Sequence, residues 1–283
     1  MARAGSVSIL VVCLAALPSS AGGPPPPSLL SGPYQVGDLG VLSLRVVKNE
    51  VKGTYASGSR CDFSTSDQLL EGTLEGSAFV GKLTTCLEGS GCGTTGVLPF
   101  FGVVSDTAIT TYLTIPSGCS APGLDDRRVV TIQIDYGWLK KNGEDAMRAG
   151  KWDAAIAFLR RAAQLPPGAN DPSVLNLLGS AHNMSKAYAE GRQVFEAALE
   201  LANKRGAPAE LKANILYNLA CSEAGVANRD PGLQARAIEH LKQALQLGSP
   251  NQFREGLAMD GDLDPLRGLP EFQKLPGAKK GPR

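Results

Sequence analysis

The second half of the chain contains the stretch YGWLKKNGEDAMRAGKWDAAIAFLRRAAQLPPGA at residues 136–169 and the stretch PSVLNLLGSAHNMSKAYAEGRQVFEAALELANKRG at residues 172–206. The two stretches match at a constant offset of 36 residues, as Gly143 and Gly179 show. Each has apolar residues at helical spacing on both sides of a short turn. A fixed repeat of this length indicates stacked pairs of antiparallel helices.

A third and less regular copy begins near Glu210 and contains Leu216, Leu219 and Ala220 at the matching positions. Its second helix is expected to carry Ala237, Leu241 and Ala244. The interval between matching small residues is longer here than in the first copy, so we expect a longer turn between the two helices. One such helical pair cannot bury its own apolar face, and about three are needed to form a core.

This pattern resembles the tetratricopeptide-repeat (TPR) family, in which small residues lie where the two helices cross and an aromatic residue follows the turn. Gly143 and Gly179 match the small position, and Trp152 and Tyr188 match the aromatic one. The resemblance implies three repeats over residues 136–250.

The end of the chain resembles the closing segment of bacterial TPR proteins, through the stretch Asp262-Leu263-Asp264-Pro265-Leu266-Arg267 and the later Phe272. The resemblance implies a capping segment over residues 251–276, followed by a basic tail over residues 277–283. The alternating aspartates are also similar to a calcium loop, but Pro265 and the absence of a later Glu break that motif.

In TPR proteins the first helices of the pairs line a groove that binds an extended peptide or a helix of another protein. The resemblance therefore implies a partner-binding groove in this chain. Its candidate residues are Lys140, Glu144 and Arg148 from the first repeat, Asn176, Ser180 and Asn183 from the second, and Asn214, Tyr217 and Cys221 from the third.

The first half has a different pattern over residues 34–135, where short apolar or alternating runs recur between turns rich in Gly, Ser and Asn. This predicts about eight antiparallel strands, which form either a small barrel or a sandwich. The expected fold class is thus two domains, an all-β barrel or sandwich followed by an all-α TPR solenoid. The strand spacing and the Gly53-Thr54-Tyr55 strand loosely resemble the lipocalin and avidin barrels, which implies a small apolar ligand as an alternative function.

The N-terminus has the features of an export signal over residues 1–21, with Arg3 before the apolar run from Val7 to Leu17 and small residues at the end. The run is too short to span a bilayer, so no transmembrane span is expected after cleavage, although an uncleaved anchor is the alternative. Residues 22–33 are expected to form a proline-rich linker. We expect an exported protein, periplasmic or extracellular, of bacterial type.

Cysteine usage fits export. Cys13 lies in the signal, and Cys61, Cys86, Cys92 and Cys119 lie together in the β-rich half. Export favours two disulfides, for which three pairings exist, and we favour Cys61–Cys86 with Cys92–Cys119 over a zinc site. Cys221 is expected to be a small packed residue.

No catalytic motif is present: the sequence has no G-x-S-x-G, no H-E-x-x-H and no phosphate-binding loop. Its two histidines, His182 and His240, fall in helices where packing is their expected role. The net charge of +1 argues against a protein that coats nucleic acid, which would carry a basic excess. We therefore expect a non-enzymatic interaction module with no cofactor and no metal, which binds another protein; the alternative is a ligand-binding barrel with the helices as a docking or oligomerisation arm.

Overall fold

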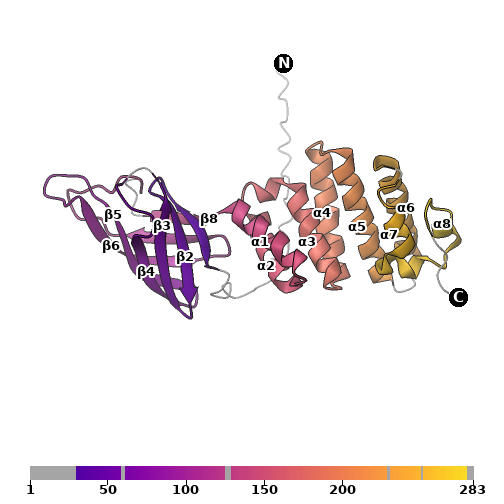
Figure 1. The fold of residues 1–283 in the computed structure, drawn as a ribbon, viewed down its shortest axis with the longest axis horizontal. Helices are drawn as coiled ribbons and strands as arrows, with labels where there is room; N and C mark the ends of the chain where they lie inside the picture. The colour runs from indigo at the N-terminus through magenta and orange to yellow at the C-terminus, as the bar shows by residue number, and fades with distance from the viewer. Residues whose placement is uncertain (1–29, 59–60, 125–128, 228–229, 250, 279–283) are drawn as a thin grey trace, which may run out of the picture.

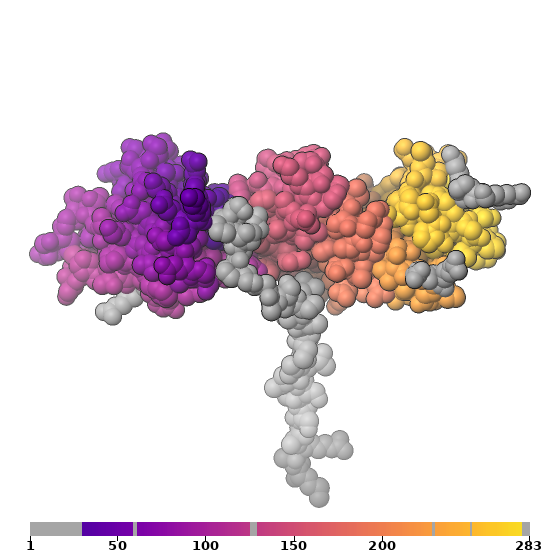
Figure 2. Space-filling view, turned by 90° about the horizontal axis from the view of Figure 1, so that it is seen from below, coloured from indigo at the N-terminus to yellow at the C-terminus, as the bar shows by residue number. Residues whose placement is uncertain are grey.

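The computed structural model describes residues 30–58, 61–124, 129–227, 230–249 and 251–278. A β-barrel and a helical region follow one another along the long axis of the molecule (Figure 1). The space-filling view shows the same order, with the barrel at one end and the C-terminal segment at the other (Figure 2).

The barrel has eight antiparallel strands, each hydrogen-bonded to its neighbours in sequence. Pairing of the first strand with the last closes it, for example Tyr34 with Ile134. This closure excludes a sandwich. The strands are β1 (Gly32–Val36), β2 (Gly40–Val47), β3 (Glu50–Ser57), β4 (Gln68–Glu75), β5 (Ala78–Cys86), β6 (Thr95–Val104), β7 (Ala108–Leu113) and β8 (Val129–Ile134).

The barrel interior is filled by side chains. Every second residue of β8 points inward, so that Val130, Ile132 and Ile134 are buried while their neighbours are exposed. Phe79 is fully buried and meets Phe100 edge-to-face, with ring centroids 4.9 Å apart. An eight-stranded barrel is about the size at which side chains alone fill the interior.

Two disulfides, Cys61–Cys86 and Cys92–Cys119, fasten the loops at the end of the barrel that lies away from the helices. This is the pairing favoured above. Cys221 is a free thiol, buried in the helical region.

The helical region is built of antiparallel pairs. Its elements are α1 (Tyr136–Arg148), α2 (Trp152–Gln164), η2 (Gly168–Asn170), α3 (Pro172–Met184), α4 (Tyr188–Lys204), α5 (Ala209–Ala227), α6 (Pro231–Leu247), α7 (Arg254–Met259), η3 (Gly261–Leu266) and α8 (Pro270–Gln273). Glycine allows close crossing inside two of the pairs. A Cβ on Gly143 would lie 2.6 Å from the Leu159 side chain, and one on Gly179 would lie 2.7 Å from the Phe195 ring.

The predicted fold class, a barrel or sandwich followed by a TPR solenoid, is wrong as stated. The β part is a closed barrel, and the helices that follow it are not a uniform solenoid. The helices lengthen from 13 residues in α1 to 19 in α5, and the region ends in the short, irregular elements α7, η3 and α8. The layout is an eight-stranded barrel followed by a helical region.

The two parts also share one core, which the sequence did not indicate. Leu139 of α1 and Ala162 of α2 belong to the same buried cluster as the barrel residues Leu30 and Ile134. At Gly32, where φ is 149°, a Cβ would lie 2.9 Å from the Trp138 ring, so only glycine lets α1 approach the barrel this closely.

Arg161 connects the two parts by hydrogen bonds. Although it lies on α2 it is only 3% exposed, and its guanidinium donates to the backbone carbonyl of Asp106 in the β6–β7 turn and to the Tyr34 hydroxyl. Burial raises the pKa of Tyr34, and the positive charge of Arg161 opposes that effect. Burying an arginine is costly unless its donors are satisfied, so Arg161 fixes the barrel against the first helical pair.

Several expectations concern residues outside the described ranges, namely the signal over residues 1–21, Cys13, most of the linker and the end of the basic tail. The described chain begins with the buried Leu30, and β1 starts at Gly32, inside the range expected for the linker. None of the helices in the described ranges combines the length and apolar character needed to cross a bilayer.

Candidate functional site

The predicted groove residues lie on α1, α3 and α5, the first helices of the three pairs. We call this surface the first-helix face. On α1, Lys140 donates to the Asp171 carboxylate over 3.1 Å and to the Ser173 hydroxyl over 3.0 Å. Tyr136 donates to the same carboxylate over 2.7 Å. Lys140 therefore joins α1 to the start of α3 rather than standing free.

Asp171 caps α3 by accepting a hydrogen bond from the backbone N–H of Ser173, as the sequence Asp-Pro at a helix start favours. Burial alone would raise the pKa of Asp171, but hydrogen bonds from Ser173, Tyr136 and Lys140 outweigh burial and lower the pKa to about 2. The pKa of Tyr136 is raised, first by burial and then by its bond to Asp171. The Asp171 carboxylate is therefore ionised in the folded protein at neutral pH.

Between α3 and α5, amide side chains form a network. Asn218 donates to the Asn176 side-chain oxygen over 3.1 Å and lies 3.4 Å from the Ser180 hydroxyl. Asn183 is only 6% exposed; it donates to the Asn218 carbonyl and accepts from the Ser222 hydroxyl. Asn183 thus uses both ends of its amide to hold two helices together, and a partner cannot reach it.

On α5, the groove candidates are covered by the C-terminal segment of the same chain. Tyr217 stacks on Phe253 with ring centroids 4.9 Å apart, and its hydroxyl donates to the Asp260 carboxylate over 3.1 Å. Asn214 accepts a hydrogen bond from Gln252 over 2.8 Å. Cys221 is buried, with its sulfur 3.6 Å from the same Asp260 carboxylate. Burial is the main cause that raises the pKa values of Tyr217 and Cys221.

Internal contacts bury Asn183, Tyr217 and Cys221, so these three groove candidates are not open on the first-helix face. The open part of the first-helix face lies on α1 and α3. There Glu144, Asn176 and Ser180 are half-buried and Arg148 is exposed, paired with Asp145 one turn earlier. Met184, at the end of α3, is 50% exposed.

Three aspartates outside the predicted groove residues receive these side chains. Asp171 and Asp260 each accept a tyrosine hydroxyl from a first helix, Tyr136 and Tyr217 respectively. Asp262 accepts from Tyr188 over 2.6 Å and pairs with Lys186 over 2.8 Å. For Asp171 the available signal was its position immediately before the predicted second repeat, because an Asp at a helix start caps the helix.

A buried charged group lies between α5 and α6. Glu223 is fully buried and lies 2.8 Å from His240 Nδ1 and 3.0 Å from an Arg236 nitrogen. His182 is buried as well, and burial lowers its pKa. Within the described ranges, no group of three or more His, Cys, Asp or Glu side chains is placed to hold a metal ion.

No protein-family model matches the chain, and a search of curated proteins finds no match. Among solved structures, the TPR2AB-domain:pHSP90 complex of yeast Sti1 matches with 17% sequence identity and a TM-score of 0.36. The match covers 47% of this chain and 45% of that one, so this chain spans less than half of the protein it resembles. At this level the similarity assigns no role to any residue.

Proposed function

We propose that this chain is an exported, non-enzymatic interaction module that binds a segment of another protein on the open part of the first-helix face, formed by α1 and α3. The helical pairs are, in this proposal, related to tetratricopeptide repeats. The constant offset of Gly143 and Gly179, and their matching contacts with Leu159 and Phe195, support that relationship.

One observation carries the proposal: the α5 part of the first-helix face already holds a chain segment. The C-terminal segment binds there by an aromatic stack on Tyr217 and by hydrogen bonds to Asn214 and Tyr217. These contacts use the Phe253 ring, the Gln252 amide and the Asp260 carboxylate, so a segment with an aromatic ring and polar side chains can bind such a surface. The matching positions on α1 and α3 hold no such segment in the described chain.

The ligand-binding alternative is disfavoured by the barrel interior. Tyr34, Leu42, Phe79 and Ile132 are each no more than 1% exposed and belong to one packed cluster. A ligand needs a cavity lined by side chains that do not already touch one another. Export is supported by the two disulfides, which persist in oxidising compartments such as the bacterial periplasm.

Site-specific photo-crosslinking tests the proposal. A photoreactive residue is placed at Glu144 or at Asn176, and a matched probe is placed at Glu200 on α4, outside the first-helix face. We expect the same partner to be captured at Glu144 and Asn176 but not at Glu200. The charge reversals Glu144→Lys and Arg148→Glu should then abolish capture at Asn176, while Glu200→Lys leaves it unchanged. Capture at Glu200 alone, or capture insensitive to the reversals, would show that the partner binds elsewhere.

A further inference from the structure

Strand β6 is apolar on both of its faces. Its inward residues Leu98 and Phe100 are buried in the barrel core. Its outward residues are apolar as well: Val97, Pro99, Phe101 and Val103. A strand that is apolar on both sides is typical of a sheet that is covered on both sides. The outer face of β6 is nevertheless exposed, with Val97 at 59% and Phe101 at 48%.

The apolar surface continues across the neighbouring strands in one row. Val80 on β5 pairs with Phe101 on β6, Phe101 pairs with Tyr112 on β7, and Tyr112 pairs with Val129 on β8. All four side chains are between 41% and 57% exposed. Contiguous apolar area of this kind marks an interaction surface on a soluble protein. We call Phe101 and Tyr112 the aromatic ridge.

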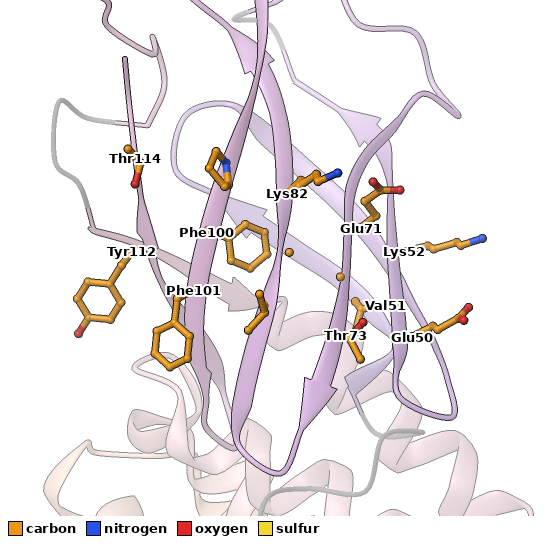
Figure 3. Close-up of a pocket in the computed structure, with 14 residues that line it drawn as sticks. Glu50, Val51, Lys52, Glu71, Thr73, Lys82, Phe100, Phe101, Tyr112 and Thr114 are labelled. Atoms are coloured by element: carbon orange, nitrogen blue, oxygen red, sulfur yellow. The ribbon is translucent and has the colours of Figure 1, made fainter. Parts of the chain in front are cut away.

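A groove of about 850 Å³ lies beside the aromatic ridge. Its floor includes the backbone of Gly72 and Gly81, which pair in register across β4 and β5; a Cβ on either would point into the barrel, toward Phe79 and Phe100 respectively. Figure 3 shows the aromatic ridge on one side of this groove, and Lys52, Glu71 and Lys82 on the other. We call Gly72 and Gly81 the glycine floor. The ridge and the floor thus lie next to each other on one face.

We propose that a second copy of this chain covers this face, with the aromatic ridge of each copy seated over the glycine floor of the other. A two-fold axis that passes between a ridge and a groove places the ridge of each copy opposite the groove of the other. A face that carries both features side by side can therefore pair with itself. The groove lining holds two acidic residues, Glu50 and Glu71, and two basic residues, Lys52 and Lys82. Because the two signs balance, two copies of this face can meet without net charge repulsion.

Analytical ultracentrifugation of the oxidised chain over a range of concentrations tests the proposal. We expect the wild type to sediment as a dimer that dissociates on dilution. The ridge variant Phe101→Ser/Tyr112→Ser should be monomeric at concentrations where the wild type is dimeric. Leu247→Ser is the matched control, because Leu247 is 43% exposed at the end of α6, in the helical region; it should remain dimeric.

A second variant separates loss of association from loss of folding. Thr73→Arg places a long charged side chain in the groove while leaving the ridge intact, and Thr73 is exposed, so the barrel should fold normally. It should weaken the dimer at least about tenfold. Mixing the two variants gives a second test: the ridge variant and Thr73→Arg together restore one ridge-over-floor contact, so a heterodimer should form at a concentration at which each variant alone is monomeric. A monomeric wild type, or a ridge variant that stays dimeric, would overturn the proposal.

Discussion

The barrel joins its first strand to its last, as the pairing of Val36 with Ile132 shows, whereas the helical region is held mainly by contacts between helices adjacent in sequence. The barrel also has two disulfides, and the helical region has none among its described residues. Closure makes the barrel a unit that forms as a whole. A stack of local pairs can instead lose its end while the rest persists. The barrel is therefore expected to unfold as one unit, whereas the helical region can open locally at its C-terminal end.

The largest expected effects come from removing one buried ring in each region. Phe79→Ala in the barrel and Phe195→Ala in α4 should each cost about 3 to 5 kcal/mol of unfolding free energy, because both rings are fully buried. Hydrogen exchange read region by region should show loss of protection in the barrel for the first variant, and in α3–α6 for the second. Equal loss everywhere in both variants would mean that the two regions unfold as one unit.

Breaking a disulfide should affect the barrel alone. Cys61 and Cys86 are 25 residues apart and Cys92 and Cys119 are 27 apart, so each bond should contribute roughly 3 kcal/mol through the unfolded chain. Denaturant titration of Cys61→Ser/Cys86→Ser, and of the reduced wild type, should therefore show a weaker barrel. Exchange in α3–α6, which are joined by no disulfide, serves as the internal control and should not change.

Arg161→Ala should weaken the connection between the two regions. It removes the hydrogen bonds to the Asp106 carbonyl and the Tyr34 hydroxyl, at a cost of about 2 to 3 kcal/mol. We expect the unfolding transitions of the barrel and the helices to separate in calorimetry. Arg160→Ala, one residue earlier and exposed, is the control and should leave the trace unchanged. Transitions that stay merged would show that the shared apolar core suffices.

The C-terminal segment should loosen without unfolding the rest. Tyr217→Phe keeps the ring that stacks on Phe253 but loses the bond to Asp260, which should cost about 1 kcal/mol. Limited proteolysis should then cut faster within residues 251–275. Tyr112→Phe, on the exposed barrel face, should show wild-type cutting. An unchanged rate in Tyr217→Phe would indicate that stacking alone retains the segment.

The smallest effect is a pH dependence at Asp171. Its folded pKa is lowered to about 2, below the ordinary 3.8, so the carboxylate stabilises the folded state above about pH 4 and loses that contribution as the pH falls toward 2. Asp171→Asn keeps a capping side chain, so at pH 7 it should cost only about 0.5 kcal/mol. The difference from wild type, measured by denaturant titration, should shrink between pH 4 and pH 2. A constant difference would contradict the assignment.

The repeat was readable from sequence because helix crossing leaves a local signal. Gly143 and Gly179 had to be small for Leu159 and Phe195 to fit, and these pairs recur at one offset. Barrel closure left no such signal. Alternating strands such as Val129–Ile134 look the same in a barrel and in a sandwich, and only the pairing of β1 with β8 distinguishes them.

The site was harder to predict than the helices. The repeat pattern predicts that Asn183, Tyr217 and Cys221 lie on the first helices of their pairs, as α3 and α5 show, but exposure depends on what the rest of the chain covers. Phe253 and Asp260, which lie more than thirty residues later in the chain, cover Tyr217. The outer face of β6 shows the converse. The apolar run Leu98-Pro99-Phe100-Phe101 alone does not show which side chains face outward; the register does, because it aligns Phe101 with Val80 and Tyr112.

A single residue, Asp135, separates the last barrel strand from the first helix. It caps α1 by accepting from the Trp138 backbone N–H over 2.6 Å, so the chain passes from strand to helix with no flexible tether. Together with the shared core and Arg161, this fixes the first helical pair against the barrel. The two proposed partners would bind on either side of this junction, one on α1 and α3 and the other on β5–β7. The junction, and neither binding surface, would then set the distance and the angle between the two partners.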